Sequence, residues 1–514
     1  MAFRKCQIIR KKKGNFIMKY KGSYFNMWDA WYMNVNDTIH AFHLKAHSGK
    51  NWNVGHVYTE DLLHFKHMRD VLETLPEEKY PDDCLGKFTG CAIEKDGTYY
   101  LYYTMRDRVE SEKIGLAIST DLEHFTEYEH NPVLVPDKEL FVVNEKGKKT
   151  NCRDMLVVYD EEQEKYFGYF AAMANIKGRG ELGVIGVAES TDLLYWTNQK
   201  IVYVPEFNGV VEVPNVFKID NKWYMTLMTT TAYGAKGAVL EPNLNSYIIT
   251  ASSDASDKVF QCGKDNVFLG STRINNGYAL RCVDYKGKLY AMCIDRSEYG
   301  ASISLPKEVR MINGVIKPCY ADILKNMRTG KQWDVFEFSR IPTTFAWENV
   351  IAGQIEKTDR WIEVTGYKNS LQVFKANIDA VKSLEAEFDI SGDFEEAGLV
   401  LYCSSDKIEK IYEHKERWDD YVWSANYISL NKKDNLIIFN KGAVEPVCQR
   451  QFTFNEGEKI SVRVIAMEGQ LEVYINDVLL ISCAMETKSY IAPGVFAFSG
   501  KAEISDFRVY ELEE

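Results

Sequence analysis

Short runs of strand-favouring residues alternate with polar turns over roughly the first 320 positions of the chain. Aromatic and β-branched residues bounded by such turns are typical of β-strands. Four clear runs span residues 98–104, 165–170, 222–228 and 288–293. Helical periodicity is restricted to two short segments, near residues 59–66 and 320–328. The pattern therefore predicts an all-β chain.

The strand runs belong to a repeated unit. Each unit has a strand, a polar turn, an aromatic strand, a loop, a third strand, an acidic turn and a fourth strand. The acidic turn has the form Ser/Thr-x-Asp-Leu, and its aspartates are Asp61, Asp121, Asp192 and, in a weaker copy, Asp254. A carboxylate at such a position can accept hydrogen bonds from its own turn, so we interpret these aspartates as structural.

Repetition of this unit predicts a five-bladed β-propeller between about residue 20 and about residue 320, with 278–305 as the fifth unit. One four-stranded blade cannot bury both of its faces alone, so blades pack radially. After about residue 340 the strands become shorter and alternate, which favours a β-sandwich. We therefore expect a propeller catalytic domain over residues 1–330 and a sandwich domain over residues 345–514.

Composition excludes several classes of function. The net charge of −12 disfavours a nucleic-acid partner. No apolar run predicts a signal peptide or a membrane span, and the 11 cysteines lack C-x-x-C spacing, so we expect reduced thiols and a cytoplasmic protein. The sequence contains no metal-ligand cluster, phosphate loop or redox motif, and hence predicts no metal and no cofactor. It leaves the oligomeric state open.

Three acids stand out because each opens a predicted blade and lies outside the recurring turn: Asp29, Asp154 and Glu212. The first strand of each blade lines the central channel of a propeller, so these side chains should converge. Three carboxylates in one pocket repel one another, and at least one pKa should be raised. Glycoside cleavage needs such an arrangement, with one ionised and one protonated carboxyl group. Taken singly, each acid could equally well be an ordinary solvated or ion-paired side chain without a catalytic role.

Four motifs occur in an order that resembles glycoside hydrolase family 32, the β-fructofuranosidases. Residues 53–65 look like the family's W-G-H-x-x-S-x-D-L-x-H-W, and residues 88–92 resemble W/F-S-G-S-A. Residues 153–155 and 212–214 each match two of three positions, in R-D-P and E-C-P respectively. The family is built as a five-bladed propeller followed by a β-sandwich, so the resemblance covers most of the chain.

The resemblance implies roles for individual residues. Asp29 would be the nucleophile, Glu212 the general acid/base that carries the proton, and Asp154 the stabiliser of the transition state. The implied substrate-binding residues are Trp28, His43, Phe88, Thr89, Arg153 and Asn215.

The first motif departs from the family pattern, because N-D-P-N-G is replaced by Trp28-Asp29-Ala30-Trp31-Tyr32. His43 stands near the place where the family usually has Gln. It would either replace a lost donor or be a structural histidine. These changes concern groups that would contact the sugar ring, so they affect the choice of substrate more than the fold or the type of reaction.

The expected function is hydrolysis of β-fructofuranosidic bonds in sucrose or short fructo-oligosaccharides, with retention of configuration. Retention requires the carboxyl groups of Asp29 and Glu212 to be about 5–5.5 Å apart. One alternative is the same chemistry on another furanoside or with a sugar as acceptor. A non-catalytic sugar-binding propeller is disfavoured, because a binder does not need three close carboxylates.

Overall fold

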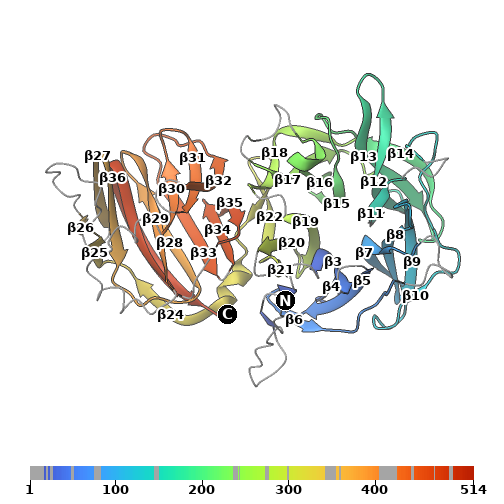
Figure 1. The fold of residues 1–514 in the computed structure, drawn as a ribbon, viewed down its shortest axis with the longest axis horizontal. Coiled ribbons are helices and arrows are strands. Elements are labelled where there is room, and N and C mark those ends of the chain that lie inside the picture. Colours follow the sequence, from blue (N-terminus) through green and yellow to red (C-terminus); the bar gives the residue numbers. More distant parts are fainter. Residues whose placement is uncertain are drawn as a thin grey trace, which may run out of the picture.

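The structure is a computed structural model. It describes residues 17–18, 21–22, 27–47, 51–74, 83–143, 150–235, 241, 244–272, 277–297, 300–341, 355–357, 361–404, 425–441, 445–467, 469–485 and 490–513. Within these ranges strands predominate, and the prediction of an all-β chain is confirmed (Figure 1). The described helices are short 3-10 turns, and none of them is long and apolar enough to cross a membrane.

Between residues 27 and 312 the strands form consecutive antiparallel groups of four. The first group is β3 (Met27–Val35), β4 (Thr38–His47), β5 (Asn51–Thr59) and β6 (His64–His67). The second is β7 (Gly86–Lys95), β8 (Thr98–Arg106), β9 (Glu112–Ser119) and β10 (Thr126–Glu127). The third is β11 (Cys152–Asp160), β12 (Lys165–Ile176), β13 (Gly180–Ser190) and β14 (Thr197–Tyr203).

Two further groups follow. The fourth is β15 (Glu212–Ile219), β16 (Lys222–Thr230), β17 (Ser246–Ser253) and β18 (Gln261–Ser271). The fifth is β19 (Tyr278–Tyr285), β20 (Lys288–Ser297), β21 (Gly300–Ile303) and β22 (Lys307–Ile312). In this group β21 and β22 both pair with β20, and β22 continues to β23 (Val315–Cys319) as the outer strand. The four strand runs that the sequence predicts lie within β8, β12, β16 and β20, the second strands of their groups.

The first strands of the five groups contact one another in a closed order. β3 contacts β7, β7 contacts β11, β11 contacts β15, β15 contacts β19, and β19 contacts β3. Figure 1 shows the groups arranged radially about these inner strands. Near the N-terminus, β1 (Ile17–Met18) pairs with β6, and β2 (Lys21–Gly22) pairs with β21. The N-terminal segment therefore joins the first group to the last.

The recurring acidic turn is built as the sequence predicts. Oδ1 of Asp61 accepts hydrogen bonds from the backbone N–H groups of residues 63 and 64, at 2.9 and 2.8 Å. Asp121 and Asp192 do the same for the residues two and three positions after them. Each turn places the following leucine at positive φ, with 63° at Leu62. The segment 59–66, a possible helix from the sequence, is this turn followed by β6.

The C-terminal strands pair in two branches that meet at one long strand, β36 (Tyr490–Leu512). Its first part pairs with β29 (Phe394–Ser404), which continues to β30 (Asn426–Asn431), β31 (Leu436–Lys441) and β32 (Glu445–Gln451). Its last part pairs with β28 (Leu384–Ser391), which continues to β33 (Ile460–Met467), β34 (Gln470–Ile475) and β35 (Val478–Cys483). β27 (Trp361–Ala376) runs along both parts and also pairs with β25 (Phe338–Ile341) and β26 (Ile355–Lys357).

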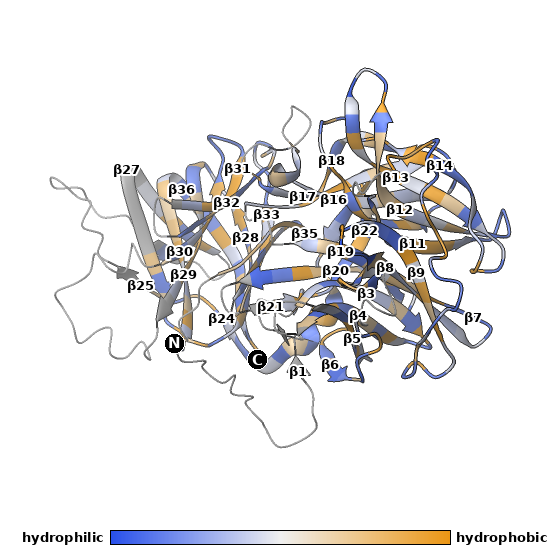
Figure 2. Ribbon diagram, turned by 45° about the vertical axis from the view of Figure 1, so that its right-hand side comes forward, coloured by the Kyte–Doolittle hydropathy of each residue, from blue (hydrophilic) through white to orange (hydrophobic). Residues whose placement is uncertain are grey.

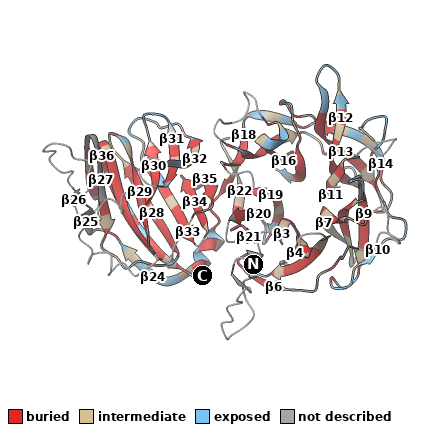
Figure 3. Cartoon of the chain, in the orientation of Figure 1, coloured by how far each residue is buried: buried red, intermediate tan, exposed pale blue. Residues whose placement is uncertain are grey.

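Apolar and polar residues alternate along the C-terminal strands. In β28 the apolar side chains of Leu384, Ala386, Phe388 and Ile390 are buried, while Glu387 and Asp389 alternate with them. Figure 3 shows buried positions along the strands of both branches, and Figure 2 shows hydrophobic and hydrophilic residues interleaved along them. Burial of these apolar side chains stabilises the C-terminal strands.

The chain passes from the fifth group to the C-terminal strands near residue 328. β23 (Val315–Cys319) forms a hairpin with β22, and the 3-10 helix η3 (Asp322–Met327) leads directly into β24 (Arg328–Asp334). β24 pairs with β36, from Arg328 opposite Leu512 to Asp334 opposite Arg508. The polar residues near 326–330 resemble a linker, but Arg328 is held by a bidentate bond to Glu385 at 2.8 and 2.9 Å.

Candidate active site

A cavity of about 280 Å³ lies at one end of the inner strands. All five four-stranded groups contribute to its wall. Its lining residues are Trp28, Asp29, Leu44, Trp52, Phe88, Thr89, Thr104, Arg106, Glu112, Arg153, Asp154, Glu212, Val213, Tyr233 and Tyr278. The three acids singled out from the sequence thus reach one cavity, although 183 positions separate Asp29 from Glu212. Of the residues expected to bind substrate, Trp28, Phe88, Thr89 and Arg153 also line it.

A β-bulge at the same height in every inner strand presents these side chains. In β11, Arg153 pairs with Ala171 but Leu156 with Tyr169, so three steps along β11 match two along β12. The same shift occurs after Met27 in β3, after Phe88 in β7, after Glu212 in β15 and after Tyr278 in β19. A bulge re-aims side chains and is common next to active sites.

The three acids occupy consecutive positions of this shared bulge. Glu212 is the last regular residue before it, Asp154 is the first of the two residues inside it, and Asp29 is the second of the two. The sequence suggests that the three acids occupy equivalent positions in their blades. The structure places them at three successive positions of the bulge, each on a different inner strand. Asp154 has φ of 60°, in the left-handed region that a non-glycine residue rarely adopts.

Asp29 in β3 is held through one of its two oxygens. The Thr89 hydroxyl donates to its Oδ2 at 2.5 Å. The other oxygen, Oδ1, has no hydrogen-bond partner among the residues that the structure describes. Burial, opposed by the Thr89 bond and reinforced by the charge of Glu212, raises the pKa of Asp29 to about 6.

Asp154 in β11 is fixed through both its backbone and its side chain. Its N–H donates to Thr104 Oγ1 at 3.1 Å, and its Oδ2 accepts the N–H of Val213 at 3.1 Å. Burial raises the pKa of Asp154 above its usual range, and the charges of Glu212 and Asp29 add to that effect against Arg153. Burial contributes more to these raised pKa values than the crowding of carboxylates on which the sequence analysis relies.

Arg153 joins three of the carboxylates in the cavity. Its guanidinium donates to Glu212 Oε1 from Nε at 3.2 Å and from Nη2 at 2.7 Å. Its Nη1 donates to Glu112 Oε2 at 3.2 Å, and its Nε lies 3.7 Å from Asp154 Oδ2. The second oxygen of Glu212, Oε2, faces the hydroxyl of Tyr278 at 3.5 Å.

Aromatic rings make up much of the remaining wall. Trp28 packs edge-on against Tyr278, with ring centroids 5.2 Å apart, and against Trp52 at 6.3 Å. The guanidinium of Arg296 lies 3.7 Å from the centre of the Trp28 ring. Flat apolar rings beside hydrogen-bonding groups are suited to binding the faces of sugar rings.

Two residues expected to bind substrate lie outside the cavity lining. His43 is buried, packs its ring on Gly55 and approaches the carbonyl of Leu44 at 3.2 Å. Burial lowers the pKa of His43 to about 4, which favours the neutral form of its ring. Asn215 is also buried, and its Oδ1 accepts the N–H of Cys282, which ties β15 to β19.

The sequence analysis missed several lining residues. Tyr278 stands at the bulge position of Glu212, so an alignment of the inner strands would have found it. Arg106 and Glu112 are direct cross-strand partners and form an ion pair at 2.6 Å. Trp52 is the second residue of β5 and directly precedes the motif at residues 53–65. Nothing in their local sequence distinguishes Arg106 and Glu112 from other surface charges.

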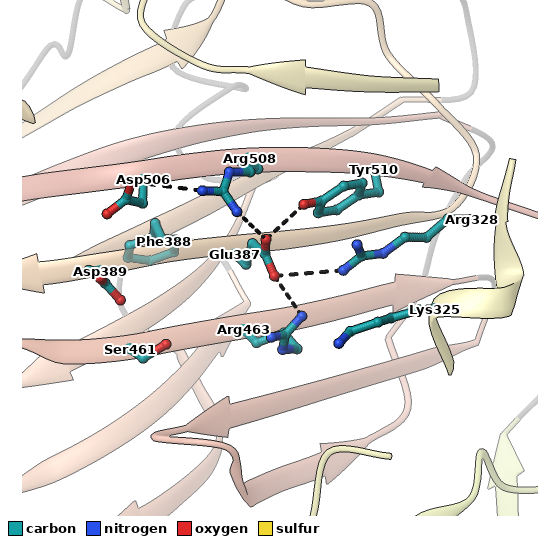
Figure 4. Close-up of a pocket in the computed structure, with 10 residues that line it drawn as sticks. All are labelled: Lys325, Arg328, Glu387, Phe388, Asp389, Ser461, Arg463, Asp506, Arg508 and Tyr510. Carbon is teal, nitrogen blue, oxygen red and sulfur yellow. Dashed lines mark hydrogen bonds and ion pairs between the residues drawn. The ribbon is translucent and has the colours of Figure 1, made fainter. Parts of the chain in front are cut away.

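A larger hollow, of about 550 Å³, lies on the polar face of β28, β33 and β36 (Figure 4). Glu387 stands at its centre and contacts Arg463 at 2.7 Å, Tyr510 at 2.8 Å, Arg508 at 3.3 Å and Arg328 at 3.6 Å. Since these arginines are already ion-paired, the cluster fastens β24 to the sheet. The convergence of buried acids favours the smaller cavity as the active site.

Among the described residues no group of three or more His, Cys, Asp or Glu side chains has an arrangement that could hold a metal ion. The cavity presents carboxyl groups, arginines and aromatic rings.

Comparisons with known proteins identify the family of this chain. Residues 29–292 match the model of the glycosyl hydrolases family 32 N-terminal domain. A probable sucrose-6-phosphate hydrolase of Psychromonas ingrahamii is 25% identical over 189 residues. That match covers 35% of this chain and only 31% of the relative.

Solved structures share the fold over nearly the whole chain. Sucrose-6-phosphate hydrolase from Lactobacillus gasseri has a TM-score of 0.67 at 14% identity, covering 96% of this chain and 93% of that one. Exo-inulinase from Aspergillus awamori has a TM-score of 0.67 at 14% identity, covering 97% and 98%. A β-fructofuranosidase from Bombyx mori has a TM-score of 0.64 at 14% identity, covering 97% and 93%.

Proposed function

The chain belongs to glycosyl hydrolase family 32, and from this premise we propose that it hydrolyses β-fructofuranosidic bonds in sucrose or short fructo-oligosaccharides. The observation that carries the proposal is the convergence of Asp29, Asp154 and Glu212 on one cavity with aromatic walls. Two of these carboxyl groups have raised pKa values, as expected where an active site tunes its acids.

Asp29 is the proposed nucleophile. With its pKa near 6, about nine-tenths of it is ionised at pH 7, and the Thr89 bond orients it through Oδ2. Its Oδ1 would attack the anomeric carbon and form a fructosyl-enzyme ester. Water would then hydrolyse that ester, so that two inversions give net retention.

Glu212 is the proposed general acid/base. Arg153 grips its Oε1, which leaves Oε2, beside Tyr278, to hold the proton that goes to the leaving oxygen. In the second step the same oxygen would take a proton from the attacking water. Asp154, fixed at Oδ2 by the Val213 N–H, would accept hydrogen bonds from substrate hydroxyls and oppose the positive charge of the transition state.

Trp28, Phe88, Thr89 and Arg153 remain in the proposed substrate-binding set, and Trp52 and Tyr278 join it. His43 and Asn215 are proposed to support the strands beneath the cavity. The substrate is expected to be a small oligosaccharide, because a cavity of about 280 Å³ accommodates only a few sugar units.

We also infer that the five groups form a five-bladed β-propeller followed by a β-sandwich. The cyclic contacts of the inner strands and the bridging by β1 and β2 support closure. The proposed boundary falls at η3, between β23 and β24, because β24 pairs with the C-terminal strands.

A reducing compartment, the cytoplasm, is the proposed location. No disulfide joins the nine cysteines whose side chains the structure describes, and six of these cysteines are buried. Burial raises the pKa of Cys91 and of Cys293 to about 12, which keeps these thiols protonated. Titration of the denatured native protein with a thiol reagent should find all 11 cysteines reduced, whereas several disulfides would contradict this location.

The test of function is a substrate panel with product analysis. Sucrose, sucrose 6-phosphate, short β-2,1- and β-2,6-fructo-oligosaccharides and an aryl arabinofuranoside would be incubated with the protein and with its Asp29→Asn variant. The parent protein should release fructose, and the Asp29→Asn variant should not. With methanol added as an acceptor, the parent protein should also form the methyl β-fructoside. Turnover of the arabinofuranoside without any fructose release would refute the proposed sugar.

A further inference from the structure

Arg281 in β19 is a buried cation that the proposed chemistry does not use. Its side chain is only 1% exposed, and the residue is not part of the cavity lining. It is the first regular residue after the bulge of the fifth inner strand, opposite Met292. A fully buried guanidinium is costly unless its charge and its donors are compensated, so its partners show what it stabilises.

The partners of Arg281 are backbone carbonyl oxygens of three other inner strands. Its Nη2 donates to the carbonyl of Asp154 at 3.0 Å and to that of Gly90 at 3.4 Å. Its Nη1 donates to the carbonyl of Pro214. The planar fork of arginine can reach several acceptors at once in a fixed geometry, which a lysine ammonium group cannot do.

All three carbonyls belong to bulge residues. Gly90 follows Thr89, which holds Asp29, and Pro214 follows Val213, whose N–H holds Asp154. Asp154 is itself the third carbonyl partner. One side chain from the fifth strand therefore braces the bulges of the second, third and fourth strands, next to the contacts that fix the acids.

The charge of Arg281 also acts on the same carboxyl groups. It lowers the pKa of Asp29 and that of Asp154, against the larger effect of burial. Burial lowers the pKa of Arg281 from its usual value, but arginine keeps its proton in proteins. The cation thus favours the ionised forms that a nucleophile and a charge stabiliser need.

We propose that Arg281 is a positioning residue for the acidic site, which braces three bulges through their carbonyl oxygens and supplies the buried positive charge beside Asp29 and Asp154. It acts on the reaction through these groups and does not touch the substrate. The inference rests on the proposed function only for its kinetic arm, since the state of the two aspartates can be measured without substrate.

The test compares Arg281→Gln, which removes the charge, with Arg281→Lys, which keeps the charge but loses the fork. In Arg281→Gln we expect the acid limb of kcat/KM to move about one pH unit to higher pH. Its kcat should fall about 10- to 100-fold while KM changes little, because misplaced groups weaken catalysis more than binding. In Arg281→Lys the acid limb should stay near that of the parent protein while kcat still falls.

Arg179 provides the matched control. Its guanidinium donates to the carbonyls of Pro205 at 2.6 Å and Phe207 at 2.8 Å, outside the cavity lining. Arg179→Gln should leave the acid limb unchanged even if it lowers thermal stability. A purely structural role for Arg281 would give that same result in Arg281→Gln.

A substrate-free measurement separates this proposal from the proposed function. Carboxyl ¹³C shifts of aspartate-labelled protein, assigned with Asp29→Asn and Asp154→Asn, would report both titrations directly. The titrations of Asp29 and Asp154 should move to higher pH in Arg281→Gln. In Arg281→Lys they should remain near the parent values, and this variant alone tests the charge role if Arg281→Gln does not fold. Unchanged titrations in a folded Arg281→Gln would overturn the charge role, and full kcat in Arg281→Lys would overturn the bracing. If the parent protein cleaves no fructoside, the proposed function fails while the ¹³C titrations still decide for or against Arg281.

Discussion

Replacing Thr89 by Val tests how the protein keeps its proposed nucleophile ionised. Val has nearly the shape of Thr but lacks the hydroxyl that donates to Asp29 Oδ2 at 2.5 Å. Both residues are buried, so water has little access to replace the lost donor. The carboxylate form of Asp29 should therefore lose a specific stabilising contact, and the pKa of Asp29 should rise from about 6.

The size of the shift follows from the type of bond. A hydrogen bond to a charged group contributes about 1.5–3 kcal/mol, and one pKa unit corresponds to about 1.36 kcal/mol. The variant should therefore have an Asp29 pKa of about 7 to 8. Attack requires the ionised form, so activity is lost as the pH falls through this pKa. At pH 7 the ionised fraction would drop from about nine-tenths to between a half and a tenth.

The assay is kcat/KM on the active fructoside between pH 5 and pH 9, which reports ionisations of the free enzyme. In Thr89→Val the acid limb should move up by about one to two pH units, with activity recovered at alkaline pH. Thr89→Ser is the matched control, because it keeps the hydroxyl and should keep the limb. An unshifted limb in Thr89→Val, with activity lowered equally at every pH, would refute this account of Asp29.

Three further predictions concern the acids and the contact between the two parts of the chain. Asp29→Asn should lower turnover by roughly 10⁴-fold or more while calorimetry finds substrate affinity largely retained; near-normal turnover would show that another group attacks. Glu212→Gln should slow natural substrates about 10²- to 10⁴-fold and activated aryl substrates much less, and equal losses on both would exclude it as the proton donor. Lys307→Met should cost about 3–5 kcal/mol in urea unfolding, because buried Glu472 loses its partner at 2.6 Å. The double variant with Glu472→Gln should regain most of that loss, and a lack of recovery would show that the pair is not the cause.

The repeated unit could be predicted because its signals are local. Asp61, Asp121 and Asp192 bind backbone groups only two and three residues away, so the same four-residue pattern gives the same turn wherever it occurs. The strand after each polar turn was found for the same reason. The early start of β24 could not be found in this way, because its partner β36 lies more than 150 positions further along the chain.

The candidate site was predictable only in part. Asp29, Asp154 and Glu212 were found as acids at the starts of strands, and the cavity does collect them. Glu112 and Arg106 gave no signal, because their place in the cavity depends on the end of the β8–β9 hairpin meeting Arg153 of another group. His43 had two readings in the sequence, and only the pairing of β4 with β5, which sets its ring against Gly55, shows that it lies outside the cavity lining.

The shared bulge explains how a repeated fold yields a site without symmetry. Regular antiparallel pairing would give each group the same side-chain orientation, since residues alternate strictly across a strand. The bulge adds a position, and three different strands fill its successive positions with Glu212, Asp154 and Asp29. The left-handed φ of Asp154, 60°, costs conformational energy, and the bonds from the Val213 N–H and to Thr104 hold it there. The asymmetry that separates an attacking from a protonating carboxyl group is therefore set by the backbone register. Because Arg281 binds the backbone carbonyl oxygens of three of these bulges, it is the side chain that we expect to control this asymmetry.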